Sequence, residues 1–151
     1  MKEEILSHAV GNWSVDLSSV LDMGCGSGIV TKLLLNHGAV EVDSSDPADY
    51  AEFKFKERFG RACLRYGFED IAGGTFPPKK YTLVVCSYSL HFHKSSLSEF
   101  LYRLRRLTST LLVIGPGDLP VIDSRYWYNA GEHQTKNHTK GRLFRAKWLM
   151  L

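Results

Sequence analysis

The apolar positions of this chain form short runs that alternate between the spacing of strands and the spacing of helices. Nearly continuous apolar runs are separated by stretches in which apolar residues share one face of a helix. The strands predicted from these runs cover residues 20–22, 39–45, 62–66, 81–87 and 111–114. The helices predicted around them cover residues 3–10, 28–37, 48–59 and 95–107. Alternation of this kind predicts βαβ units, and so a mostly parallel sheet with helices on both faces.

The first predicted strand runs into a glycine-rich turn, residues 20–28 with the sequence VLDMGCGSG. Glycines let the backbone turn sharply and let a ligand lie against it. The amides that open the following helix point at such a ligand. A dinucleotide fingerprint needs G-x-G-x-x-G, but here the third glycine comes one residue early and Ile29 takes the sixth place. This spacing conflicts with an NAD-dependent oxidoreductase, which stays the weakest alternative.

The D-x-G-x-G-x-G frame of residues 22–28 resembles motif I of the class I S-adenosylmethionine-dependent methyltransferases. The resemblance covers about residues 15–115. It implies S-adenosylmethionine as the cofactor and methyl transfer as the reaction. It also implies that the loop binds the methionine end of the cofactor, with Asp22 reaching the amino group through water. The residues expected in this loop are Asp22, Gly24, Cys25, Gly26 and Gly28.

The same resemblance places an acid at the end of the second strand, where a carboxylate accepts both ribose hydroxyls. Asp46 is our assignment and Asp43 is the alternative. After the third strand, the resemblance implies a polar side chain near the adenine amino group and an apolar one against the ring. Phe68 with Glu69 or Asp70 matches this description, although Phe68 is equally suited to the core.

The end of the fourth strand flanks the transferred methyl group in this family. Ser87 is expected beside the cofactor, and Tyr88 in the wall of the methyl-transfer pocket. His91 is a candidate general base because histidine titrates near neutrality, with a packing role as the alternative. Cys86 is predicted to be a buried apolar residue. His91 and His93 lack partners at ligand spacing, so we expect no metal.

The fold implied is a Rossmann-like three-layer α/β/α sandwich, and residues 1–151 form a single domain. This fold normally ends in two further strands, the last of them antiparallel. After residue 115 the chain has one strand-like segment, residues 142–150, and a polar stretch, residues 129–140. The other strand must be short, missing or formed by residues 121–128. The C-terminal strand pair is therefore expected to be shortened.

Composition and charge bear on the cell compartment and the binding partner of the protein rather than on its reaction. No apolar run reaches the length of a membrane span, and the N-terminus has no signal-peptide pattern. Three cysteines without a C-x-x-C pair favour the reducing cytoplasm, or the nucleus. Net charge is +3, but residues 101–151 hold nine Lys and Arg against three Asp and Glu. A basic C-terminal third of this kind can form a surface for nucleic acid, and the alternative is a solvated basic face that balances an acidic one.

Besides the oxidoreductase, two function classes remain open. In the first, the chain is a methyltransferase, and its acceptor is RNA, protein or a small molecule. In the second, it is a non-catalytic binding or scaffold subunit that keeps the fold and has a protein partner. Thr82 favours the second class slightly, because many family members carry an aspartate at that position of the fourth strand.

Overall fold

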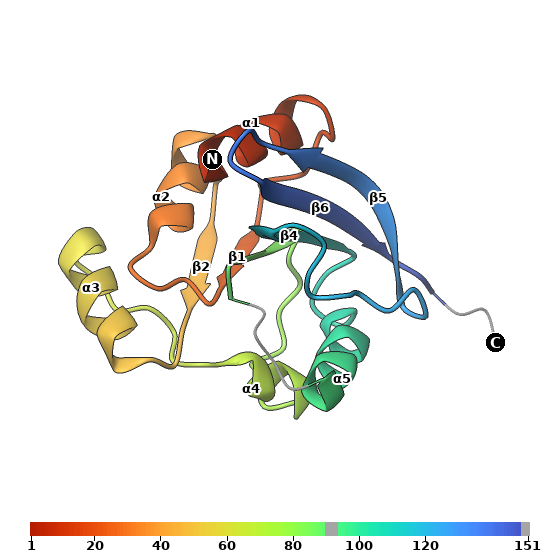
Figure 1. Cartoon of the computed structure of the whole chain (residues 1–151). Coiled ribbons are helices and arrows are strands. Elements are labelled where there is room, and N and C mark those ends of the chain that lie inside the picture. Colours follow the sequence, from red (N-terminus) through yellow and green to blue (C-terminus); the bar gives the residue numbers. More distant parts are fainter. Residues whose placement is uncertain (90–93, 149–151) are drawn as a thin grey trace.

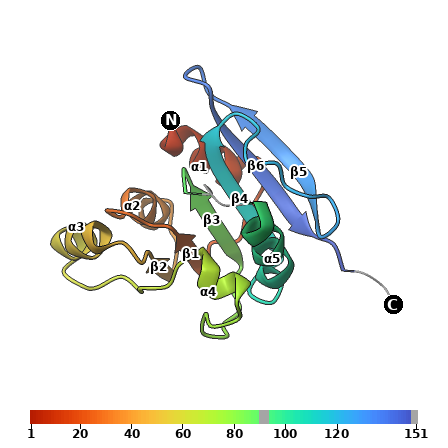
Figure 2. The ribbon, with the colours of Figure 1, turned by 60° about the horizontal axis from the view of Figure 1, so that its bottom comes forward.

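The computed structural model describes residues 1–89 and 94–148. One sheet has the order β2-β1-β3-β4-β6-β5 (Figure 1, and with all six strands labelled in Figure 2). The first four strands are parallel, and β6 is antiparallel to both of its neighbours. The strands are β1 (Val20–Met23), β2 (Val42–Ser45), β3 (Leu83–Ser87), β4 (Thr110–Pro116), β5 (Trp127–Gln134) and β6 (Thr139–Ala146). The helices are α1 (Lys2–Gly11), α2 (Ile29–Asn36), α3 (Asp49–Phe59), α4 (Phe68–Ala72) and α5 (Lys94–Leu104).

Helices cover the two faces of the sheet, which confirms the predicted three-layer sandwich (Figure 2). Successive side chains of a strand point to opposite faces. In β1, Leu21 and Met23 therefore pack with α4 and α5, whereas Val20 packs with α1 and α2. Asp22 lies on the face of Val20, and its side chain reaches α2. This alternation brings a carboxylate beneath the helix that follows the glycine loop.

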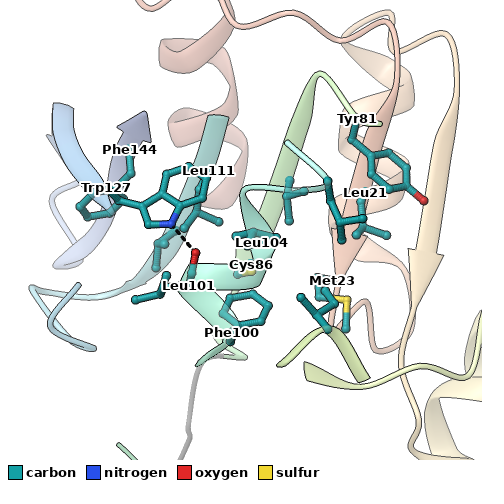
Figure 3. Packing of buried hydrophobic residues seen from close by; sticks show 14 of the residues in the cluster. Leu21, Met23, Tyr81, Cys86, Phe100, Leu101, Leu104, Leu111, Trp127 and Phe144 are labelled. Carbon is teal, nitrogen blue, oxygen red and sulfur yellow. Dashed lines mark hydrogen bonds between the residues drawn. The ribbon is translucent and has the colours of Figure 1, made fainter. Parts of the chain in front are cut away.

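The larger apolar cluster joins the last two strands to α5 (Figure 3). The indole of Trp127 is 1% exposed, and its Nε1–H donates to the carbonyl oxygen of Leu101 over 2.8 Å. Phe144 of β6 packs into the same cluster. Trp127 thus anchors β5, which has no other buried residue.

The C-terminal strand pair is longer than the sequence indicated, because β5 and β6 have eight residues each. β5 starts in the expected region 121–128 and continues into the polar stretch, where it ends at Gln134. Only the first side chain of this edge strand is buried, so the strand needs no apolar run. The backbone hydrogen bonds to β6 hold it in place. The apolar pattern could not predict such a strand.

Two other elements differ from the prediction. Residues 62–66 do not form a strand, because only Leu64 pairs with Ser45 in an isolated bridge. Within that segment the side chain of Cys63 alone is buried, which leaves little apolar surface to extend the pairing. The predicted loop after it contains the short helix α4, capped by Asp70. No helix in the described part of the chain is long and apolar enough to cross a membrane.

Candidate functional site

A pocket of about 410 Å³ lies at the carboxyl ends of β1 and β3. Open α/β sheets bind their ligands at this edge. The pocket is lined by Lys2, Asp22, Gly24, Cys25, Gly26, Ser27, Ile29, Val30, Asp46, Tyr50, Ser87, Tyr88 and Ser89. It thus brings together the glycine loop, the end of β2 and the residues after β3.

The three motif glycines have different physical reasons to be glycine. All three have positive φ angles, which side chains rarely adopt. A Cβ at Gly28 would lie 2.3 Å from Phe59 and 2.9 Å from Phe55, and one at Gly24 would lie 2.6 Å from the Cβ of Ser89. A Cβ at Gly26 would meet only the Tyr50 hydroxyl, at 3.5 Å. Packing therefore requires Gly24 and Gly28, whereas Gly26 leaves space open in the pocket.

Asp22 is a buried carboxylate in the floor of the pocket, 1% exposed. Its Oδ2 accepts a hydrogen bond of 2.7 Å from the Thr31 hydroxyl of α2. Burial raises the pKa of Asp22 to about 6, although the bond from Thr31 and the charge of Lys2 both act in the opposite direction. At neutral pH the group is therefore mostly ionised, and it is a buried anion suited to a cationic group of a ligand.

Asp46 is the second carboxylate of the pocket, and the backbone fixes its orientation. Its Oδ2 accepts the Gly26 N–H over 2.9 Å, and its Oδ1 accepts the Ala48 N–H over 2.9 Å. Asp43, the alternative, does not line the pocket. Burial acts to raise the pKa of Asp43, but hydrogen bonds from Lys79 and Tyr81 outweigh it and lower the pKa. Asp43 is thus held in an ion pair away from the pocket.

Cys25 and Cys86 are buried and have structural contacts. Cys25 lines the pocket, but its side chain clusters with Phe55 and Cys63, and burial raises the pKa of its thiol far above the usual range. Burial does the same to Cys86. Neither cysteine is a thiolate at neutral pH, so neither is poised as a nucleophile.

The residues expected near adenine lie outside the pocket lining. Asp70 accepts the Gly67 N–H over 2.7 Å and the Thr75 hydroxyl over 2.9 Å, so it caps α4. The Phe68 ring packs edge to face on Phe100, with 5.2 Å between centroids. Glu69 is exposed. Phe68 therefore has the core contacts that the sequence allowed, and Glu69 is the acid without a capping role.

The end of β3 and the residues that follow it form another part of the pocket lining. The Ser87 hydroxyl is buried and has no hydrogen-bond partner among the described residues. Tyr88 has a φ of 53°, a left-handed conformation uncommon for a residue with a side chain. Its hydroxyl lies 2.9 Å from Oγ1 of Thr139 on β6, and Lys2 lies over its ring at 5.3 Å. His91 lies outside the described residues.

Lys2 is a lining residue that sequence reasoning missed. It is the first residue of α1, about twenty residues before the glycine loop, and no local sequence pattern marks it. It is the single Lys or Arg that lines the pocket within residues 1–89 and 94–148. Tyr50 of α3 was missed too, although its place just after Asp46 could have drawn attention to it. The described residues contain no group of three His, Cys, Asp or Glu placed to hold a metal ion.

Comparison with known proteins agrees with this geometry. The methyltransferase domain family matches residues 20–110. The chain is 28% identical over 145 residues to an uncharacterized protein of Schizosaccharomyces pombe, a match that covers 74% of this chain. The chain spans 59% of the length of that relative. With the fold and the motif I loop, these findings show that the chain belongs to the class I S-adenosylmethionine-dependent methyltransferase family.

Solved structures show the same fold. A putative methylase of Haemophilus influenzae has a TM-score of 0.69 at 17% identity, with 96% of this chain and 98% of that chain covered. A putative methyltransferase of Streptococcus mutans, solved in complex with SAH, has a TM-score of 0.64 at 16% identity and covers 94% and 96%. A putative RNA methyltransferase of Pyrococcus horikoshii reaches 0.70 at 15% identity and covers 96% and 82%.

Proposed function

We propose that this chain binds S-adenosylmethionine in the pocket and transfers its methyl group to an acceptor. The observation that carries the proposal is the open space at Gly26, flanked by the carboxylates of Asp22 and Asp46 in a chain of this family. When bound, S-adenosylmethionine supplies a methyl group already activated by its sulfonium. The part left to the protein is binding, orientation and exclusion of water.

The methionine end of the cofactor carries an ammonium and a carboxylate. Asp22 would accept a hydrogen bond from the ammonium, directly or through water, because it is an anion buried beside the loop. Lys2 would hold the carboxylate, as the one Lys or Arg lining the described part of the pocket. The unpartnered hydroxyl of Ser87 would find a polar partner on the same ligand, which would remove the cost of burying it alone.

The ribose and adenine would extend past the end of β2. Each carboxylate oxygen of Asp46 accepts one backbone N–H and has a second lone pair for a ribose hydroxyl. Glu69 would accept the adenine amino group, since Asp70 already caps α4. Tyr88 would form the wall of the methyl-transfer pocket, where its hydroxyl bond to Thr139 fixes the ring. A general-base role for His91 stays a prediction.

Calorimetric titration with S-adenosylhomocysteine tests the proposal. The wild-type chain should bind, and Gly26→Arg should lose binding while it stays folded, because the new side chain fills the pocket and the site has room for a Cβ. Gly38→Arg is the matched control. Gly38 also has a left-handed φ, of 93°, with no atom within 4 Å of an added Cβ, and it does not line the pocket. Equal affinity in the Gly26→Arg variant would overturn the assignment.

Turnover separates the enzyme from a non-catalytic binding subunit. Labelled S-adenosylmethionine, incubated with the protein and fractionated cell extract, should label one fraction of RNA, protein or small molecules. Binding of S-adenosylhomocysteine without any labelling would favour the binding subunit. A thermal shift by NAD that exceeds the shift by S-adenosylhomocysteine would contradict both.

Three unbridged cysteines further support a reducing compartment, the cytoplasm or the nucleus.

A further inference from the structure

The basic C-terminal third divides into groups with different environments. Lys140 forms ion pairs with Asp118 and Glu132, so its charge is compensated. Arg142 is buried, and its Nη2 donates to the carbonyl oxygen of Pro120 over 2.9 Å. Both cations therefore have partners within the fold. Three other cations, Arg105, Arg106 and Lys147, lie just after the ends of α5 and β6.

At that place one arginine lies among three aromatic rings. The guanidinium carbon of Arg105 is 4.4 Å from the ring centroid of Tyr126, 4.9 Å from that of Tyr102 and 5.6 Å from that of Trp148. Its Nη1 donates to the carbonyl oxygen of Lys147 over 3.0 Å. These contacts hold together segments far apart in the sequence and keep the rings in defined positions.

We call this region the basic–aromatic surface, and it presents both charge and exposed rings. Trp148 is 62% exposed and Tyr102 is 41% exposed. Within the described chain, no carboxylate forms an ion pair with the cations of this surface. The surface consists of Tyr102, Arg105, Tyr126, Lys147 and Trp148, together with Arg106, which is exposed and follows Arg105 in the chain.

The electrostatics of the helix explain only part of this arrangement. Cations near the carboxyl end of a helix are favoured by its dipole, which accounts for Arg105 and Arg106 just past the end of α5. The dipole does not account for Lys147 or for the indole of Trp148, which come from the strand at the other end of the chain. Arg106 also lines a small pocket of about 200 Å³, in which Arg103 is already ion-paired with Glu99.

We propose that the basic–aromatic surface binds single-stranded nucleic acid. Unpaired bases expose flat faces that stack on aromatic rings, and their phosphates attract arginine and lysine. Duplexes hide those faces, and acidic peptides offer charge without bases. The combination of uncompensated cations with two exposed rings therefore fits a single strand better than either. The exposed guanidinium of Arg106 would contact one phosphate.

This surface is separate from the cofactor pocket. Arg145 of β6 pairs with Thr110, the first residue of β4, so the end of β6 lies at the amino edge of the parallel strands. The pocket lies at their carboxyl edge. The length of β4 puts about 20 Å between the two edges. The proposal thus concerns anchoring of a nucleic acid and does not depend on methyl transfer.

Fluorescence anisotropy with a labelled oligouridine of about twelve nucleotides tests the proposal, together with the matching DNA strand and an RNA duplex. We expect both single strands to bind more tightly than the duplex. Trp148→Ala should weaken binding about tenfold with the salt dependence unchanged, because it removes a stacking face. Arg106→Ala should reduce the slope of log K against log salt by about 0.7, because it removes one phosphate contact.

Matched controls come from exposed residues of the other helices. Phe53→Ala of α3 removes an aromatic ring that is 66% exposed, and Lys32→Ala of α2 removes an exposed cation. Both variants should bind as the wild type does. Unchanged binding by Trp148→Ala and Arg106→Ala would overturn the proposal. It would also be overturned if the duplex bound as tightly as the single strands, or if an oligoglutamate peptide competed as well as unlabelled oligouridine.

Discussion

The candidate cofactor pocket lies at the carboxyl ends of the parallel strands and the basic–aromatic surface lies at their amino ends, and the two are built in different ways. The pocket depends on backbone conformation and on buried polar groups, such as the left-handed turn at Gly26 and the carboxylate of Asp22. The surface depends on side chains that remain in water, such as those of Arg106 and Trp148. Substitutions in the pocket should therefore change stability as well as binding, and exposed substitutions on the surface should change binding alone.

The largest effect is expected at the glycine that packing requires. Gly28→Ala should lower the free energy of unfolding by about 3–5 kcal/mol, because it combines a strained left-handed residue with overpacking against Phe55 and Phe59. Urea denaturation measures the change. Gly38→Ala is the control, with a φ of 93° and no atom near the new Cβ, and should cost only about 1–2 kcal/mol. Equal losses in both would show that packing at Gly28 is relaxed.

The next effect concerns the buried carboxylate and has opposite signs for stability and binding. The folded-state pKa of Asp22 is raised from 3.8 to about 6, so the folded protein gains stability as pH falls from about 6 to about 4. Above pH 6 the ionised group costs on the order of 3 kcal/mol. Asp22→Asn removes this charge and should stabilise the protein by about 1–2 kcal/mol near neutral pH. Its affinity for S-adenosylhomocysteine should fall.

Denaturation at two pH values checks this prediction. The stability gained by Asp22→Asn should be present at about pH 7.5 and mostly absent at about pH 4.5, where the wild-type carboxyl is protonated. Asp43→Asn is the matched control. The pKa of Asp43 is lowered, so its charge stabilises the folded protein above its unfolded pKa, and this variant should lose stability at neutral pH. A destabilised Asp22→Asn variant at neutral pH would contradict the burial argument.

A smaller effect is expected at Lys2. Lys2→Ala should weaken binding of S-adenosylhomocysteine about tenfold, because a hydrogen bond between charged groups is lost. Methylthioadenosine, which has no carboxylate, should bind equally well to the variant and the wild type. Lys32→Ala, an exposed cation of α2, provides the control. If both ligands lost affinity equally, Lys2 would be a packing residue rather than a carboxylate ligand.

The smallest effect should occur on the basic–aromatic surface. Trp148→Ala and Arg106→Ala should each change the free energy of unfolding by less than about 0.5 kcal/mol, since both side chains are exposed. Thermal or urea denaturation gives the value. A loss of several kcal/mol would mean that the surface is a structural support, and the contrast with the pocket would disappear.

The central parallel strands could be predicted from the sequence because their residues are buried on both faces of the sheet. In β3 every residue is buried, so the apolar run marks the strand directly. The edge strand β5 was not predictable over its length, because only Trp127 meets the core. Leu64 shows the opposite error, in which a strand-like segment makes a single bridge to Ser45.

For the site, local sequence was enough to indicate the glycine loop and the acid below it. A strand that carries Asp22 next to its last residue and is followed by a turn through Gly24 and Gly26 is a local arrangement, since neighbouring residues determine where the backbone turns. The acid after β2 was left between Asp43 and Asp46. The structure gives the two acids different partners, because Lys79 and Tyr81 donate to Asp43 and the loop N–H of Gly26 donates to Asp46.

By itself, the sequence therefore determined the strand–glycine–helix unit, the class of cofactor to expect and the excess of basic residues near the C-terminus. Only the tertiary structure decided that Lys2 meets Asp22 in one pocket, and that Arg105 meets Trp148 on one surface. The physical reason is range. Backbone turns and apolar periodicity act between neighbouring residues, whereas charge pairing and ring stacking depend on how distant segments pack.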